Sequence, residues 1–324
     1  EYGDPVLTMQ ISLANGQLFK TGTASDTHCE GAYPEGPGID FFRFFMGAQG
    51  TMGIVSWLNV KTEYRPKHQK AYFAPFNDLE DVAEPIYKLQ RRHVGNECFV
   101  LNKFLLASLL CEKYPKDFDK LLDELPPYTL VVVIAGAPRR PLERIAYEEE
   151  ALMETGADLK FEAKKTVAGI AGLESRMLDM LRNLPSKEPY WKTVFKNSTQ
   201  DILFISTLDR AQNYVDIAQG YAASYGLSLN EIGVYLQPLE RGRACQITFS
   251  LPCDTTCGKD AERIGNLHRE LSQALVNEGA FFTRPYGPWA DMVYRHATTY
   301  TATLKELKRI FDPNNILNPG KLCF

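Results

Sequence analysis

A short alternating segment near the beginning of the chain constrains the fold most. In residues 5–20, PVLTMQISLANGQLFK, apolar and polar side chains alternate on both sides of Asn15-Gly16. Because side chains along a strand point alternately to opposite faces, this pattern predicts two strands with one buried face. An Asn-Gly pair favours the backbone of a tight hairpin turn. The sequence therefore predicts an antiparallel hairpin at this end of the chain.

The rest of the chain mixes helix and strand patterns. After a loop over 21–40, the residues up to Pro66 predict a short helix, a glycine turn and a strand. Further strands are expected over 71–76, 128–136, 202–207, 232–237 and 244–251, and helices over 79–92, 102–113, 140–155, 167–182, 208–225, 260–278 and 298–311. The strands at 232–237 and 244–251 flank ERGR and are expected to pair. This order predicts an α+β fold with an antiparallel sheet flanked by helices.

Composition argues against several classes of protein. Of the 324 residues, 44% are hydrophobic and 23% are charged, which is typical of a folded chain. The net charge of −4 gives no reason to expect nucleic-acid binding. No apolar run reaches the roughly 18 residues that a membrane helix needs, so no membrane span is expected. The cysteines are odd in number and scattered, which favours free thiols and a cytoplasmic location over a disulfide framework.

Two strings far apart in the chain are the most specific features. The first is MGAQGTMGIV at residues 46–55, preceded by GPGID at 36–40, and the second is FDPNNILNPGK at residues 311–321. Glycines at 47, 50 and 53 allow the backbone to adopt positive φ angles and to approach a bound group closely. Backbone N–H groups at such a turn can donate to a carbonyl or a phosphate.

A third string, RPYGPWADMVYR at residues 284–295, gathers arginines and aromatic side chains. Arginine can bind a carboxylate through two N–H groups, and tyrosine hydroxyls can bind a developing oxyanion. The alternative is an aromatic segment packed on the core with a salt-bridged arginine, because aromatic side chains are usually buried.

In this order and at this separation, the three strings resemble the vanillyl-alcohol oxidase / p-cresol methylhydroxylase superfamily of FAD-linked oxidases. The resemblance implies FAD as the cofactor and hydride transfer to the flavin from a small organic substrate: an alcohol, a 2-hydroxy acid or an alkyl-phenol. It implies the C-terminal part of an FAD-binding domain over 1–66, an α+β cap domain over 67–297, and a tail over 298–324 that returns to the FAD domain. No glycine-rich stretch for the FAD diphosphate is found, and the chain begins within a domain. We therefore expect an N-terminal FAD-binding fragment or subunit. The identity of the electron acceptor stays open, and a redox partner protein is one of the candidates.

The resemblance also assigns roles to residues of this chain. Those expected to contact FAD are Gly47, Gly50, Thr51, Gly53, Ile54, Asn318 and Lys321, with Lys321 as a cation that favours the anionic reduced flavin. Those expected to act in catalysis are Tyr286, Tyr294 and Arg295. Those expected to bind the substrate are Arg284, Trp289 and Gln237, although the charged turn after Gln237 is also typical of a solvated loop.

Two other interpretations stay open: a non-redox flavoenzyme similar to alkylglycerone-phosphate synthase, and a non-catalytic subunit that retains the fold. No metal site is expected. His268 in IGNLH resembles part of a metal-binding string of hydroxy-acid dehydrogenases, but the first histidine and the Asp-Gly of that string are missing. Asn197-Ser198-Thr199 fits a glycosylation sequon, a triplet that is common by chance. Cys253 and Cys257, in CDTTC, are expected to be free thiols in a loop.

Overall fold

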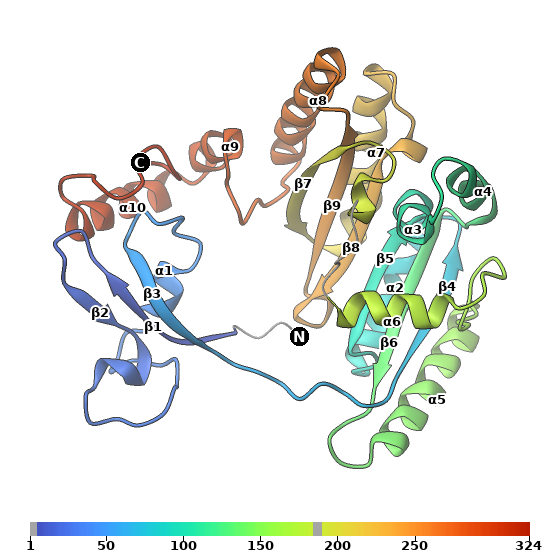
Figure 1. The fold of residues 1–324 in the computed structure, drawn as a ribbon, viewed down its shortest axis with the longest axis horizontal. Coiled ribbons are helices and arrows are strands. Elements are labelled where there is room, and N and C mark those ends of the chain that lie inside the picture. Colours follow the sequence, from blue (N-terminus) through green and yellow to red (C-terminus); the bar gives the residue numbers. More distant parts are fainter. Residues whose placement is uncertain (1–4, 184–189) are drawn as a thin grey trace. The chain divides into compact units, whose positions relative to one another are not determined.

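The computed structural model describes residues 5–183 and 190–324, which form two compact units (Figure 1). Unit 1 contains the described residues of 65–281, and unit 2 contains 5–64 together with 282–324. The first division lies near the expected one at residue 66. The second places residues 282–297, which we expected in the cap, in unit 2. There Gln49 Nε2 donates to the Pro285 carbonyl at 3.5 Å, and Thr301 Oγ1 donates to the Tyr294 carbonyl at 3.1 Å.

Unit 2 contains a three-stranded antiparallel sheet in the order β2-β1-β3. Strands β1 (Val6–Ser12) and β2 (Leu18–Lys20) are joined through Asn15-Gly16, so the predicted hairpin is confirmed. The turn needs glycine because Gly16 has a φ of 82°, and the Asn15 side chain accepts a hydrogen bond from the Gln17 N–H. Helix α1 (Phe42–Phe45) precedes the glycine turn, and β3 (Ile54–Val60) follows it, as predicted.

Two consecutive helices complete unit 2. Helix α10 (Thr298–Phe311) has the predicted bounds, and its last residue packs on α1, with the Phe44 and Phe311 ring centroids 5.0 Å apart. Helix α9 (Pro288–His296) was not expected from the sequence. Pro288 can begin this helix because a proline at the first helical position loses no hydrogen bond. The core of the unit is formed mainly by Met9, Ile11, Phe42, Phe45, Ala48 and Met52.

Unit 1 contains a six-stranded sheet in the order β4-β6-β5-β8-β9-β7. Its strands are β4 (Gln69–Phe76), β5 (Glu97–Asn102), β6 (Tyr128–Ala135), β7 (Ser198–Ser206), β8 (Gly233–Leu239) and β9 (Ala244–Cys253). Neighbouring strands are antiparallel, and β8 pairs with β9 around ERGR as predicted. The predicted α+β class, with helices flanking an antiparallel sheet, is therefore confirmed.

Helices cover both faces of this sheet. One face carries α2 (Glu80–Arg91), α5 (Pro141–Leu159), α7 (Ala211–Ser224) and α8 (Gly258–Asn277). The other carries α3 (Lys103–Leu110), α4 (Lys116–Glu124) and α6 (Leu173–Arg182), which share a core cluster with Phe73, Phe99 and Val131. Within the described residues, no helix is both long and apolar enough to cross a bilayer.

Asn102 links three elements of unit 1. Its Oδ1 accepts hydrogen bonds from the Leu105 N–H at 3.1 Å, which caps α3, and from the Val234 N–H at 3.0 Å. Its Nδ2 donates to the Ile232 carbonyl at 2.8 Å. Because a buried amide must satisfy its polar atoms, one side chain holds the end of β5 beside β8 and begins α3.

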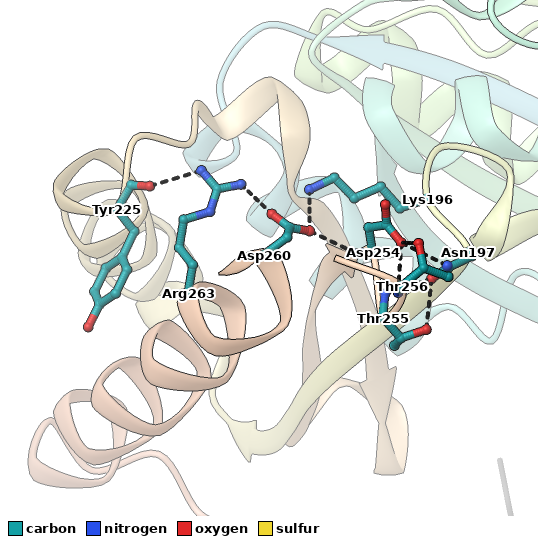
Figure 2. Close-up of polar contacts among 8 residues, drawn as sticks. All are labelled: Lys196, Asn197, Tyr225, Asp254, Thr255, Thr256, Asp260 and Arg263. Carbon is teal, nitrogen blue, oxygen red and sulfur yellow. Dashed lines mark hydrogen bonds and ion pairs between the residues drawn. The ribbon is translucent and has the colours of Figure 1, made fainter. Parts of the chain in front are cut away.

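A polar network joins the segment before β7, the loop after β9 and the start of α8 (Figure 2). Asn197 Nδ2 donates to Asp254 Oδ1 at 2.9 Å, and Asn197 Oδ1 accepts from the Thr255 N–H at 2.9 Å. The sequon asparagine therefore serves as a structural link in this loop. The nearby Cys253 is a buried free thiol, and Cys257 is an exposed one.

Asp260, in the first turn of α8, is expected to make the stability of unit 1 depend on pH (Figure 2). Burial opposes its ionisation, but the Asp254 N–H, Lys196 and Arg263 outweigh that effect and lower its pKa to about 2. An unfolded aspartate has a pKa near 3.9, so this carboxylate stabilises the fold above that pH. The stabilisation is lost as the pH falls toward 2. Between about pH 5 and pH 2, the melting temperature of Asp260→Asn should fall by less than that of the wild type. The control is Glu262→Gln, an exposed position on the same helix, whose melting temperature should fall as much as that of the wild type. Equal losses in all three proteins would contradict the assignment.

Candidate cofactor and substrate site

The glycine turn between α1 and β3 exposes its backbone. Gly47, Gln49 and Gly50 have φ angles of 76°, 52° and 74°, a region in which glycine is favoured. A Cβ atom added to Gly47 would meet no heavy atom within 4 Å. The backbone conformation therefore requires this glycine, and the space outside it is open to a group that approaches the turn.

Thr51 and Gly53 face inward instead. Thr51 is fully buried, and its Oγ1 donates to the Ala48 carbonyl at 2.7 Å. A Cβ atom on Gly53 would lie 2.2 Å from Ile11 Cγ2 on β1. Both residues thus have a structural reason to be present, and their contact with FAD stays a prediction.

Gly53→Ala is expected to lower the free energy of unfolding of unit 2 by about 1–3 kcal/mol, because the added methyl group overpacks a closed core. The measurement is chemical unfolding of the variant and the wild type. The control is a double-mutant cycle with Ile11→Ala, which removes the atom that the new Cβ would meet. An equal cost in both backgrounds would show that contact with Ile11 is not the reason for the glycine.

The terminal tail lies directly on the glycine turn. Asn318 Nδ2 donates to the Gln49 carbonyl at 2.5 Å, across 269 residues of sequence. A Cβ atom on Gly50 would lie 3.7 Å from the same Nδ2. Two other residues expected to contact FAD are also exposed: Lys321 in the tail, and Ile54 at the start of β3. The structure thus brings together the two strings that were expected to contact FAD, and we call residues 47–51 and 316–321 the turn–tail platform.

Lys308, a residue that the sequence analysis missed, links the two segments of the platform through hydrogen bonds. Lys308 is 5% exposed, and its Nζ lies 2.7 Å from the Thr51 carbonyl oxygen, 2.5 Å from Asp312 Oδ2 and 3.0 Å from the Leu317 carbonyl oxygen. The available signal was a lysine in the last turn of the expected helix, four residues before the aspartate that follows it, since residues four apart are neighbours on a helix surface.

Asp312 completes this fastening and is 1% exposed. Its Oδ1 accepts from the Ile316 N–H at 3.0 Å, and its Oδ2 accepts from the Leu317 N–H at 2.7 Å. Burial opposes its ionisation, but Lys308 and the two N–H groups outweigh burial and lower the pKa of its carboxyl. The carboxylate therefore stays ionised beside the lysine, and the buried pair is neutral overall.

The segment 284–295 divides between the core and the surface of unit 2. Trp289 is 8% exposed, and its ring packs on Phe282 with centroids 5.0 Å apart. Arg284, Tyr286 and Arg295 are exposed. The packing alternative thus describes Trp289, whereas the other three residues are accessible to a ligand.

Tyr294 is partly buried, and the pKa of its hydroxyl is raised. Burial first, and then the neighbouring Cys323 and Tyr300, raise its pKa to about 12. The phenol therefore stays protonated at neutral pH. It can donate a hydrogen bond to a substrate oxygen, but it is poorly suited to act as a base.

Gln237 lies in unit 1, whereas the other residues expected to bind the substrate lie in unit 2. It is on β8, opposite Gln246 of β9, and its Oε1 accepts from the Tyr235 hydroxyl at 2.9 Å. Its expected role in substrate binding stays a prediction.

His268 lies on α8, so its string does not form the strand of the metal-binding pattern. Its Nε2 lies 3.4 Å from the Asp201 carbonyl oxygen, and burial lowers the pKa of the imidazole. Among the residues that the structure describes, no three His, Cys, Asp or Glu side chains are grouped so as to hold a metal ion.

A family model matches the C-terminal part of the chain. Residues 290–322 match the family model described as FAD linked oxidases, C-terminal domain. The glycolate oxidase subunit GlcD of Bacillus subtilis (strain 168) is 24% identical over 98% of the chain, and the D-lactate dehydrogenase of Anaerostipes hadrus is 22% identical over 99%. The chain is thus similar to the C-terminal region of FAD-linked oxidases, by the match of its tail and by these two relatives. FAD is the cofactor of that family.

Two solved structures share the fold of this chain. p-Cresol methylhydroxylase with bound substrate has a TM-score of 0.77 at 16% identity and covers 99% of the chain. 4-Ethylphenol oxidase from Gulosibacter chungangensis has a TM-score of 0.78 at 19% identity and covers 98%. The chain spans 63% and 64% of the two curated relatives and 65% of each of these structures.

The turn–tail platform fits an FAD contact in two ways. The space outside Gly47 is open, and Gly50 and Asn318 are exposed next to one another. These residues would hold the cofactor through backbone N–H groups and the Asn318 amide, because both can pair with flavin or phosphate oxygens. Lys321 would add a positive charge near it.

Proposed function

We propose that this chain is part of an FAD-dependent oxidoreductase that removes hydride from an alcohol, a 2-hydroxy acid or an alkyl-phenol. One observation carries the proposal: the structure joins the glycine turn to the NPGK tail in a single platform, in which Gly47, Gly50 and Asn318 are exposed. FAD, when bound, supplies the hydride acceptor. The chain supplies the groups that orient the substrate oxygen.

In this proposal, Tyr294 donates a hydrogen bond to the substrate oxygen, because its raised pKa keeps the hydroxyl protonated. The exposed Arg295, next to it on α9, binds the negative charge that develops on the substrate oxygen as its hydroxyl proton passes to solvent water. Tyr286 and Arg284 are also accessible and bind the distal part of the substrate. Names of the relatives include glycolate, D-lactate, p-cresol and 4-ethylphenol, and these compounds define the first panel of substrates.

Strand β3 supports a partner segment that completes the FAD-binding domain. Within the described residues, β3 pairs with β1 along one edge, and every one of its side chains is exposed. They include Ile54 at 62%, Leu58 at 46% and Val60 at 50%. A row of apolar side chains on an unpaired edge marks an interaction surface, because it otherwise promotes aggregation. We propose that an N-terminal FAD-binding fragment or subunit covers β3.

A second candidate is a non-redox flavoenzyme. Alkyldihydroxyacetonephosphate synthase has the same fold at a TM-score of 0.61 and 12% identity and covers 98% of the chain. A non-catalytic subunit is the third, and it would bind neither FAD nor substrate productively.

The deciding experiment is an absorbance spectrum of the protein isolated from its source, with the intact mass of every chain present. Oxidised flavin bands that bleach when glycolate, D-lactate, p-cresol or 4-ethylphenol is added without oxygen support the oxidoreductase. Bound flavin that no member of a broad alcohol and phenol panel reduces favours the non-redox enzyme. A colourless protein that gains no flavin when mixed with FAD would rule out both.

A further inference from the structure

We propose that Lys308 is a positioning residue for the cofactor, which fixes the glycine turn and the tail to each other so that FAD meets them as one rigid surface. This inference rests on the proposed function, because it concerns how the platform holds FAD. Lys308 belongs to none of the three strings that the sequence analysis singled out.

The geometry around the ammonium group is complete. Lysine has three N–H donors, and here each has an acceptor from a different segment. The Thr51 carbonyl belongs to the glycine turn, the Asp312 carboxylate ends α10, and the Leu317 carbonyl belongs to the tail. The Phe324 ring lies 5.6 Å from the nitrogen. Lysine is almost never buried unless it is paired, so the cluster is held in one arrangement by the demand that all its donors be satisfied.

The carbonyl groups that accept hydrogen bonds from Lys308 lie next to the residues expected to contact the cofactor. Thr51 follows Gly50 in the turn, and Leu317 precedes Asn318 in the tail. The hydrogen bond from Asn318 to the Gln49 carbonyl forms only while turn and tail keep this register. Lys308 is buried and cannot touch FAD itself, so any effect on FAD passes through these two segments.

A purely structural lysine would stabilise unit 2 without changing the surface that FAD meets. A positioning lysine also alters the bound flavin, because small displacements of contacting groups weaken preorganised binding. The distinction requires a readout on the flavin, measured on protein that is still folded.

The test compares Lys308→Met with Lys305→Met, the same change at an exposed position one turn earlier on α10. Both are made in the complete FAD-loaded protein. Lys308→Met is expected to raise the dissociation constant of FAD at least about tenfold. It should also shift the bound-flavin absorption and circular dichroism toward those of free FAD, and speed amide exchange over 47–53 and 312–321 but not in unit 1. Lys305→Met should match the wild type. A folded Lys308→Met protein with unchanged FAD affinity and flavin spectrum would overturn the proposal.

A measurement on the wild type covers the case in which Lys308→Met does not fold. The amides of Thr51, Ile316 and Leu317 should exchange at one common opening free energy, and added FAD should protect all three together. Separate opening of turn and tail, or protection of only one of them by FAD, would overturn the proposal. A wild type that never binds FAD is a different result: it defeats the proposed function, whereas common opening would still show that the turn and the tail open as one unit.

Discussion

Asp312→Ala is expected to lower the free energy of unfolding of unit 2 by about 3–5 kcal/mol. The substitution leaves the Lys308 ammonium buried with a positive charge and no carboxylate, and it removes the acceptor for the Ile316 and Leu317 N–H groups. An uncompensated buried charge costs much more than the pair contributes when intact. Chemical unfolding followed by amide exchange over 298–324 measures the loss where it arises.

Asp291→Ala provides the matched control, because Asp291 is exposed on α9. It should change the stability of unit 2 by well under about 1 kcal/mol. The double variant Asp312→Ala/Lys308→Met should be more stable than Asp312→Ala alone, since it removes the orphaned charge together with its partner. A double variant less stable than Asp312→Ala would show that the charge of Lys308 is not the source of the loss.

Arg295→Ala is expected to lower kcat/KM about 10- to 150-fold, the range for a lost hydrogen bond to a charged group. The free energy of unfolding should change by less than about 0.5 kcal/mol, because the side chain is exposed on α9. Steady-state kinetics with a substrate found in the flavin-bleaching screen, together with thermal unfolding, measures both quantities on the same sample.

Arg309→Ala is the control for this variant, since Arg309 is also an exposed arginine on a neighbouring helix of unit 2. It should leave both quantities unchanged. If Arg295→Ala unfolds the protein while activity per folded molecule stays normal, Arg295 has a structural role, and the assignment of the exposed segment 284–295 to the substrate fails.

Some elements could be predicted because the pattern that defines them lies within a few consecutive residues. The hairpin at Asn15-Gly16 and the β8–β9 pair depend on alternation and turn chemistry within a few residues. β5 was missed because its residues, ECFVLN, are nearly all buried and so lack alternation. Its last residue, Asn102, is typical of the residue that begins a helix, and in the structure it also accepts a hydrogen bond from β8. The strand order could not be predicted, since it follows from such long-range bonds.

The candidate site divides in the same way. Glycine at positions 47 and 50 permits the positive φ angles found there, so a turn could be predicted from the sequence. The reason for Gly53 is contact with Ile11, and the role of Lys308 depends on Thr51, 257 residues away. Neither contact leaves a trace in the local sequence. Trp289 was predicted to bind the substrate because it lies in a string with arginines and tyrosines. Its packing on Phe282 gives it a structural reason to be present, and its contact with a substrate stays a prediction.

The discontinuity of unit 2 has a consequence for biosynthesis. Its sheet is made from residues 5–64, but its helices α9 and α10 come from 282–324, after the whole of unit 1. At ribosomal rates of about 5–20 residues per second, the first segment waits on the order of 10–40 seconds for its complement. Unit 1 is continuous and can fold during that interval, while the apolar β3 stays open to chaperones and to wrong partners. Substitutions in the tail should therefore reduce the yield of folded protein in cells by more than their effect on the finished molecule indicates.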